Sequence, residues 1–234
     1  MKSYIIAIPN HKESQKAADK CIRSSEEFNN DFKITKFEAI TPDRVDDIIK
    51  SENIKWNYPW EGSVTDFSSG LIKRAYPTKN KNARVACALS HYRLWKTCAQ
   101  GNDCYLVLEH DSIFMNKIDH KIIEKSPKLV ISINNPRFAT RRAVDYINKI
   151  KESTPDRQGV VKAPYIDDMN VPQGLPGNSA YIIKPNGAKK MLQLVKEYGL
   201  WPNDALMCNQ LFFGLGCTKK FYTQVQGIRS TTSL

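Results

Sequence analysis

The most constraining feature of the sequence is the apolar run from Cys104 to Leu108, which ends abruptly at Glu109, His110 and Asp111. An uninterrupted apolar run of this length is typical of a β-strand that is covered on both faces of a sheet. The acidic residues then emerge at the carboxyl end of that strand, which is where open α/β sheets bind their ligands. The chain is therefore expected to fold as an α/β protein with a site at this edge.

Alternating strand and helix patterns predict a β-α-β-α opening and a single α/β domain over residues 1–234. A chain of 234 residues is long enough to bury one core of this class and short for two. Strands are predicted at residues 3–8, 33–39, 128–133, 179–183 and 221–225. Helices are predicted at residues 11–28, 83–99 and 185–198, with shorter ones after residue 42 and near residue 203. Residues 51–82 and 134–176 lack a sustained period and are expected to be loops.

Capping residues mark several of the predicted helix ends. Asn10 with Glu13 fits an N-cap and its capping-box partner. Thr41 followed by Pro42 fits an N-cap and a first helical residue, and Gly199 stands in the terminating position of the helix over residues 185–198. With a proline at its start and a glycine after its end, the helix over residues 185–198 is the best defined in the sequence.

The formal charge of +11 favours anionic partners, which include nucleotide diphosphates, acidic glycans, phospholipid headgroups and nucleic acid. The charge alone does not choose among them, because the basic residues are spread along the chain and also fit a solvated surface. No stretch approaches the roughly 20 apolar residues that span a bilayer, so at most a peripheral membrane contact is expected. The N-terminal apolar segment is too short for a signal peptide, which predicts a cytoplasmic location.

Six cysteines lie at positions 21, 87, 98, 104, 208 and 217, without any CxxC pair. Several fall within apolar patterns, which predicts buried free thiols in a reducing compartment, with no disulfide and no zinc. Cys87, His91 and Cys98 share one stripe of the helix at residues 83–99, but three such groups along a buried helix leave no natural fourth ligand.

Glu109 and Asp111 form an acidic pair at the end of the predicted central strand. Carboxylates one residue apart can both face one pocket and offer the oxygen ligands that Mg²⁺ or Mn²⁺ prefers. Such an ion would neutralise charge on a diphosphate leaving group. By spacing alone, the pair could equally be two solvated acids at a strand end.

Four segments in order resemble the motif set of glycosyltransferase family 25, which includes lipooligosaccharide and collagen galactosyltransferases. They are FEAITPDR (37–44), CALSHYRLW (87–95), LVLEHDS (106–112) and GNSAYIIKPNGAKKML (177–192). The resemblance spans about residues 3–213. It implies a GT-A fold, a Rossmann-like mixed sheet flanked by helices. It also implies a metal-dependent, inverting transfer of a hexose, galactose or glucose, from a UDP-sugar to a hydroxyl of a glycan or other acceptor.

The resemblance assigns roles to the residues that match the family motifs. Asp111 would be the main metal ligand, and Glu109 a second ligand or a contact to ribose. Ser90 and His91 would lie near the donor, although a hydrogen-bonded core histidine explains His91 equally well. Asp204 would be the base that takes the acceptor proton, with a role in helix capping as its alternative.

Further donor contacts are expected around the ends of other predicted strands. Asn10 and Thr41 follow the first two strands, where a GT-A pocket would receive uracil and ribose, and both also fit simple capping roles. Gly177 and Asn178 precede a strand and are expected to line the sugar pocket, because glycine permits close backbone approach.

The sequence also departs from the family pattern. His110 stands where the family usually has a second acid, Arg84 to Ala86 replace an acidic residue and glycine, and a C-terminal histidine is absent, which leaves Gln224 or Gln226 as poor third ligands. Two alternatives therefore stay open. The charge of +11 motivates a glycosyltransferase that acts on nucleic acid, and the departures at His110 and Arg84 motivate a nucleotide- or carbohydrate-binding module that has lost activity.

Overall fold

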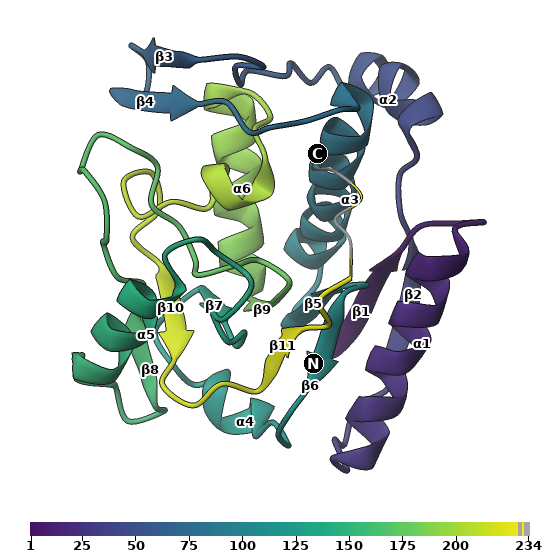
Figure 1. Ribbon diagram of the computed structural model, residues 1–234, viewed down its shortest axis with the longest axis vertical. Coiled ribbons are helices and arrows are strands. Elements are labelled where there is room, and N and C mark those ends of the chain that lie inside the picture. Colours follow the sequence, from purple (N-terminus) through teal and green to yellow (C-terminus); the bar gives the residue numbers. More distant parts are fainter. Residues whose placement is uncertain (229–230, 232–234) are drawn as a thin grey trace.

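The computed structural model describes residues 1–228 and 231, and its centre is a seven-stranded mixed sheet in the order β2-β1-β5-β9-β7-β10-β8 (Figure 1). The strands of this sheet are β1 (Lys2–Ala7), β2 (Ile34–Glu38), β5 (Tyr105–Glu109), β7 (Val130–Ser132), β8 (Val160–Lys162), β9 (Ala180–Ile183) and β10 (Leu215–Thr218). Two pairs of short strands stand apart from it: β3 (Ser63–Asp66) with β4 (Leu71–Arg74), and β6 (Ser112–Phe114) with β11 (Thr223–Val225).

Strand direction brings several chain segments to one edge of the sheet. β2, β1 and β5 are parallel, β9 is antiparallel between β5 and β7, and β10 is parallel to β7. The carboxyl ends of β1, β2, β5 and β7 therefore meet the amino end of β9 at the same edge. The expected α/β fold, a mixed sheet flanked by helices, is confirmed.

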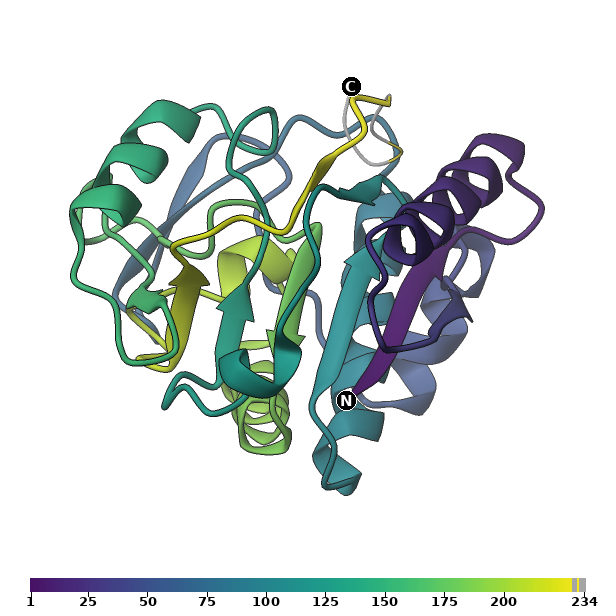
Figure 2. The same ribbon diagram turned by 90° about the horizontal axis from the view of Figure 1, so that it is seen from below.

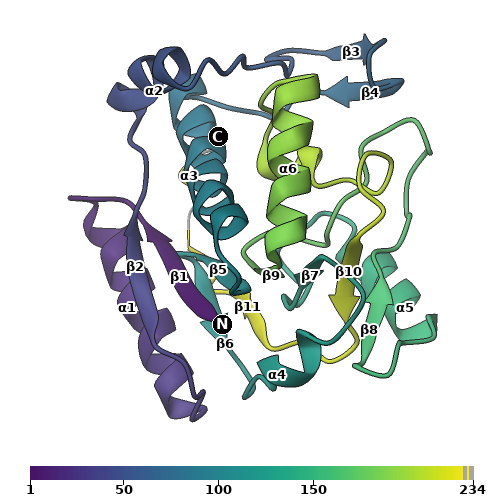
Figure 3. The ribbon, with the colours of Figure 1, turned by 180° about the vertical axis from the view of Figure 1, so that it is seen from behind.

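Helices cover both faces of the sheet. They are α1 (Lys12–Glu27), the 3-10 helix η1 (Pro42–Arg44), α2 (Val45–Ser51), α3 (Lys81–Gln100), α4 (His120–Ile123), α5 (Ala143–Glu152), α6 (Pro185–Tyr198) and α7 (Asn203–Leu206). Figure 2 shows α1 and α6 on opposite sides of the sheet, and Figure 3 shows α3 and α6 lying side by side on one of them. None of the described helices combines the length and the apolar composition needed to cross a membrane.

β5 explains the uninterrupted apolar run of the sequence. Tyr105 and Val107 point into the core beneath α3 and α6, whereas Leu106 and Leu108 point into the core beneath α1. None of these four side chains is more than 1% exposed. Each residue of the strand therefore loses apolar surface to one of two cores, and only the polar residues that follow can reach solvent.

The two regions predicted to be loops contain elements that the sequence analysis missed. The β3–β4 hairpin lies within residues 51–82, and α5 and β8 lie within residues 134–176. β6, α4 and β10 were also not predicted. All except α5 are three or four residues long, which is too short for a periodic pattern to stand out. The last predicted strand is present as β11, but it pairs with β6 outside the main sheet.

The N-cap of α1 is His11 and not Asn10, so that prediction is wrong. The Nδ1 atom of His11 accepts a hydrogen bond from the backbone N–H of Ser14 at 3.1 Å. Asn10 has a φ of 58°, a left-handed conformation that asparagine tolerates, and it turns the chain between β1 and α1. The predicted positions of Thr41 and Pro42 at a helix start are confirmed, but the helix is the 3-10 helix η1 and the Thr41 side chain caps no backbone group.

Gly187 shows why a glycine opens the GAKKML segment of α6. A β-carbon at this position would lie 2.6 Å from the backbone oxygen of Leu129, just before β7. The glycine therefore lets the first turn of α6 approach the sheet backbone.

We expect Gly187→Ala to destabilise the fold by about 1–3 kcal/mol, although glycine to alanine normally stabilises a helix interior. The close approach to Leu129 makes the substitution destabilising here, because the added β-carbon would collide with the backbone oxygen of that residue. Asn186→Ala, at an exposed position in the same turn, is the matched control and should be neutral or slightly stabilising. Urea unfolding of both variants checks the prediction, and a Gly187→Ala variant as stable as Asn186→Ala would contradict it.

Candidate functional site

A cavity of about 400 Å³ opens at the carboxyl edge of the sheet. Its walls come from the turn after β1, the loop after β2, the first half of α3 and the end of β5. Ser90, His91, Glu109, His110 and Asp111 line it together. The motifs CALSHYRLW and LVLEHDS thus contribute to the same cavity as Ala39, Ile40 and Pro42 of FEAITPDR, which lies far from them in sequence.

The other predicted donor and base residues are not among the residues that line this cavity. Asn10 and Thr41 are flanked by lining residues but are not among them. Gly177 and Asn178 lie beside the end of β5, because the backbone N–H of Glu109 donates to the carbonyl of Ser179 at 2.8 Å. Gly177 has a φ of 92°, and a β-carbon there would lie 2.7 Å from that of Ala139.

Ser90 uses its hydroxyl to hold the backbone. The Oγ atom donates to the carbonyl of Ala86 at 2.8 Å and accepts from the backbone N–H of Ile40 at 2.9 Å. The side chain therefore ties α3 to the loop after β2. This contact fixes two walls of the cavity relative to each other.

Glu109 reaches the cavity from β5 and is held by His91. The Nε2 atom of His91 lies 3.2 Å from Oε1 of Glu109, and 29% of the Glu109 side chain remains exposed. Burial raises the pKa of Glu109, but its hydrogen bond to His91 and the nearby histidines outweigh this effect, so the pKa is lowered overall. Glu109 is therefore the ionised member of the acidic pair.

Asp111 has no comparable partner. Its Oδ1 atom is buried without a hydrogen bond to any described residue. Burial, together with the charge of Glu109, raises the pKa of Asp111 to about 7. The neighbours of Glu109 therefore stabilise its ionised form, whereas the surroundings of Asp111 disfavour its ionised form.

Gln226 takes a position that argues against a place among the metal ligands, whereas His110 lines the cavity. Burial lowers the pKa of His110, against the opposing effect of Glu109. The side-chain amide of Gln226 donates to backbone carbonyls of Ser112 and Ala17, at 2.8 and 2.9 Å. Gln226 thus anchors the segment after β11 instead of facing a cation.

Asp204 lies at the start of α7, near both Glu109 and Arg84. Although Asp204 keeps exposed surface, protein atoms crowd its carboxylate, and this desolvation raises its pKa; Arg84 opposes the shift and Glu109 adds to it. Hydrogen bonds from the backbone N–H groups of Asp204 and Ala205 also lower the pKa, so the carboxylate helps to cap α7 while it remains available as a proton acceptor. Arg84 itself donates to the hydroxyl of Thr78 at 2.7 Å and lies over the ring of Tyr76.

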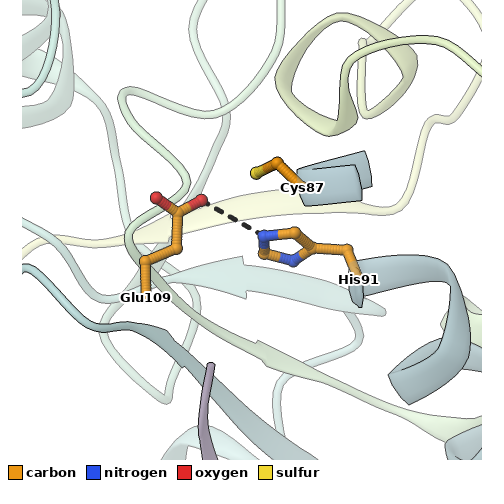
Figure 4. A group of neighbouring side chains, drawn as sticks. All are labelled: Cys87, His91 and Glu109. Carbon is orange, nitrogen blue, oxygen red and sulfur yellow. Dashed lines mark hydrogen bonds and ion pairs between the residues drawn. The ribbon is translucent and has the colours of Figure 1, made fainter. Parts of the chain in front are cut away.

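The sequence analysis missed Cys87, Tyr181 and Trp95 as neighbours of the site. Ligand atoms of Cys87, His91 and Glu109 lie within 4.8 Å of one another (Figure 4). The third member comes from β5, so a search along the helix alone could not have found it. All six cysteines are free thiols.

Comparison with known proteins places the chain in a family. The model of glycosyltransferase family 25, described as an LPS biosynthesis protein, matches residues 1–207. The class of protein is thus a glycosyltransferase. The chain belongs to glycosyltransferase family 25, which confirms the resemblance carried by the four motifs.

No curated protein matches the sequence. Among solved structures, the galactosyltransferase LgtC, in complex with donor and acceptor sugar analogs, has a TM-score of 0.41 and 12% identity, over 93% of this chain and 73% of that one. The bifunctional glycosyltransferase WbbM has a TM-score of 0.42 and 10% identity, over 94% of this chain and 38% of that one. Mouse xyloside xylosyltransferase 1 has a TM-score of 0.35 and 11% identity, over 91% and 80%.

We expect Asp111→Asn to stabilise the metal-free protein at alkaline pH. A carboxyl group whose pKa rises from 3.8 to about 7 on folding binds more protons in the folded state, so its ionisation costs stability as pH rises through that window. The variant should be more stable than wild type by up to about 4 kcal/mol at pH 8, since each pKa unit corresponds to about 1.4 kcal/mol, with the difference vanishing below about pH 4.

Unfolding with chelator present, at several pH values, measures this difference. Asp103→Asn is the matched control, because its carboxylate lies in solvent at the other end of β5. A constant difference across the pH range would show that Asp111 is not strained by its charge.

Proposed function

We propose that the protein transfers a hexose from a UDP-sugar to a hydroxyl group of a glycan, with a divalent cation at Glu109 and Asp111. The observation that carries the proposal is the partly buried acidic pair facing a cavity of about 400 Å³ at the carboxyl edge of the sheet. Family membership supports sugar transfer. The donor, the metal dependence and the inversion of configuration are the parts that we infer.

The acidic pair fits a hard divalent cation such as Mn²⁺ or Mg²⁺. It offers carboxylate oxygens, and the Oδ1 atom of Asp111 has no hydrogen-bond partner among the described residues. A cation would remove the charge repulsion that raises the pKa of Asp111. When bound, it supplies positive charge that stabilises the diphosphate leaving group.

The walls of the cavity would hold the nucleotide and its sugar. The loops after β1 and β2, with Asn10 and Thr41, are assigned to uracil and ribose. Ser90 fixes the relative position of these walls. Gly177 and Asn178, beside the end of β5, are assigned to the sugar.

Asp204 is assigned as the base. Its raised pKa makes it a stronger proton acceptor than an ordinary aspartate, while Arg84 favours its ionised form. The carboxylate would take the proton of the acceptor hydroxyl as that oxygen attacks the anomeric carbon from the face opposite UDP. The oxygen–carbon bond to the acceptor forms as the bond to the diphosphate breaks, which inverts the configuration.

Thermal denaturation with UDP and Mn²⁺ tests the donor assignment. We expect UDP to raise the melting temperature only when Mn²⁺ is present, and Asp111→Ala to abolish that increase. Asp47→Ala, at an exposed position on α2, is the control and should retain the full shift. Parallel measurements with GDP and CDP show whether the protein prefers uracil as the nucleobase. If no nucleotide raises the melting temperature in a metal-dependent way, the proposal is rejected.

Transfer activity tests the base. We expect Asp204→Asn to keep the metal-dependent UDP shift and to lose transfer by about 100-fold or more, because the amide cannot accept the proton. Full activity in this variant would exclude Asp204 as the base. UDP binding without transfer to any glycan would favour the binding-module alternative, and UDP release that depends on added DNA would favour a nucleic-acid acceptor.

A further inference from the structure

A line of three buried side chains runs from α3 through β9 to Glu109. The Nε1 atom of Trp95 lies 2.9 Å from the hydroxyl oxygen of Tyr181, and that oxygen lies 2.8 Å from Nδ1 of His91. The Nε2 atom of His91 then lies 3.2 Å from Oε1 of Glu109. Trp95, Tyr181 and His91 are each 0% exposed, so none of them can complete its hydrogen bonds with bulk water.

The direction of these hydrogen bonds follows from the donors available. An indole N–H can only donate, so the Tyr181 oxygen accepts from Trp95. Tyr181 has a single hydroxyl hydrogen, and among the described residues the Nδ1 atom of His91 is its remaining hydrogen-bond partner. Nδ1 must then be the acceptor, which places the imidazole hydrogen on Nε2, where it points at Glu109.

The opposite arrangement is unfavourable. If Nδ1 carried a hydrogen, the Tyr181 oxygen would accept from both Trp95 and His91, and its own hydrogen would have no partner in the core. A buried unsatisfied donor costs about 1–3 kcal/mol. Trp95, although it does not touch Glu109, thereby selects the tautomer of His91.

We propose that Trp95 and Tyr181 are positioning residues that fix His91 as its Nε2–H tautomer, so that His91 holds one oxygen of Glu109 and leaves the other for the cation. The part of this proposal that concerns the cation rests on the proposed function, whereas the assignment of the His91 tautomer does not. Figure 4 shows the second oxygen of Glu109 pointing away from the imidazole.

The same arrangement decides against a metal ion held by Cys87, His91 and Glu109. A metal on Nε2 would move the imidazole hydrogen to Nδ1, because a histidine ligand donates through its other nitrogen. That nitrogen faces Tyr181, which already accepts from Trp95. In addition, burial raises the pKa of the Cys87 thiol well above its ordinary value, which opposes the thiolate that a metal requires.

Nitrogen-15 NMR of the histidine side chains tests the tautomer directly. The chain has four histidines, and the signals of His91 are those lost in His91→Gln. We expect a protonated Nε2 and an unprotonated Nδ1 in the wild-type protein without metal. A protonated Nδ1 would overturn the proposal, whatever the protein's activity.

Tyr181→Phe removes the hydroxyl that selects the tautomer. We expect the single His91 tautomer to be lost and the affinity for Mn²⁺, measured by calorimetry, to fall by about 10-fold. Tyr105→Phe is the matched control, because this buried tyrosine lies on the neighbouring strand β5 and its hydroxyl is near Tyr4 and not the site. It should keep the tautomer and Mn²⁺ affinity within about 2-fold.

His91→Gln and His91→Leu separate positioning from packing. Glutamine keeps an N–H donor toward Glu109 and should recover most of the Mn²⁺ affinity that leucine loses. Equal losses in both variants, or tight Zn²⁺ binding that Cys87→Ser abolishes, would overturn the proposal. If wild-type protein shows the expected tautomer but binds no Mn²⁺, the proposed function fails and the hydrogen-bond assignment stands.

Discussion

The placement of two carboxylates at the end of a strand buried on both faces is the constraint on which the rest of the site depends. Glu109 and Asp111 leave the core just where β5 reaches the cavity, and desolvation there disfavours both charges. Neighbouring groups offset this cost of desolvation for Glu109 only. His91 stabilises Glu109, whereas Asp111 keeps an unpartnered oxygen and a pKa raised to about 7. A bound cation would thus stabilise the charge that the surroundings of Asp111 disfavour.

Helix α3 connects this electrostatic arrangement to the fold. Its buried side packs on β5 and α6, and the same side carries Ser90 and His91, which contact the loop after β2 and the end of β5. Core packing therefore sets the position of the polar groups. A shift of α3 would move the cavity wall and His91, the partner of Glu109, together, so the packing of this helix also sets the geometry of the cavity.

The sequence was sufficient to predict the helices and strands that have long apolar runs or periods. β5, α3 and α6 were predicted because each has a sustained run or period, and the acidic pair could be placed at a sheet edge for the same reason. The hairpin β3–β4 and strands β6, β8 and β10 were missed, because strands of three or four residues are defined by their partners and not by their own pattern. Likewise, Tyr181 and Glu109 meet His91 only because β9 pairs with β5, a pairing that no local spacing encodes.

The departure at His110 now has an electrostatic interpretation. A third acid at this position would add negative charge beside Glu109 and Asp111, and would make ionisation of the pair still harder. Burial instead lowers the pKa of His110, and in either protonation state a histidine here adds no negative charge beside the pair. The two carboxylates that would hold the proposed cation remain in place. The substitution therefore reduces the repulsion that the metal-free site must tolerate, without removing the acidic pair on which the proposed chemistry depends.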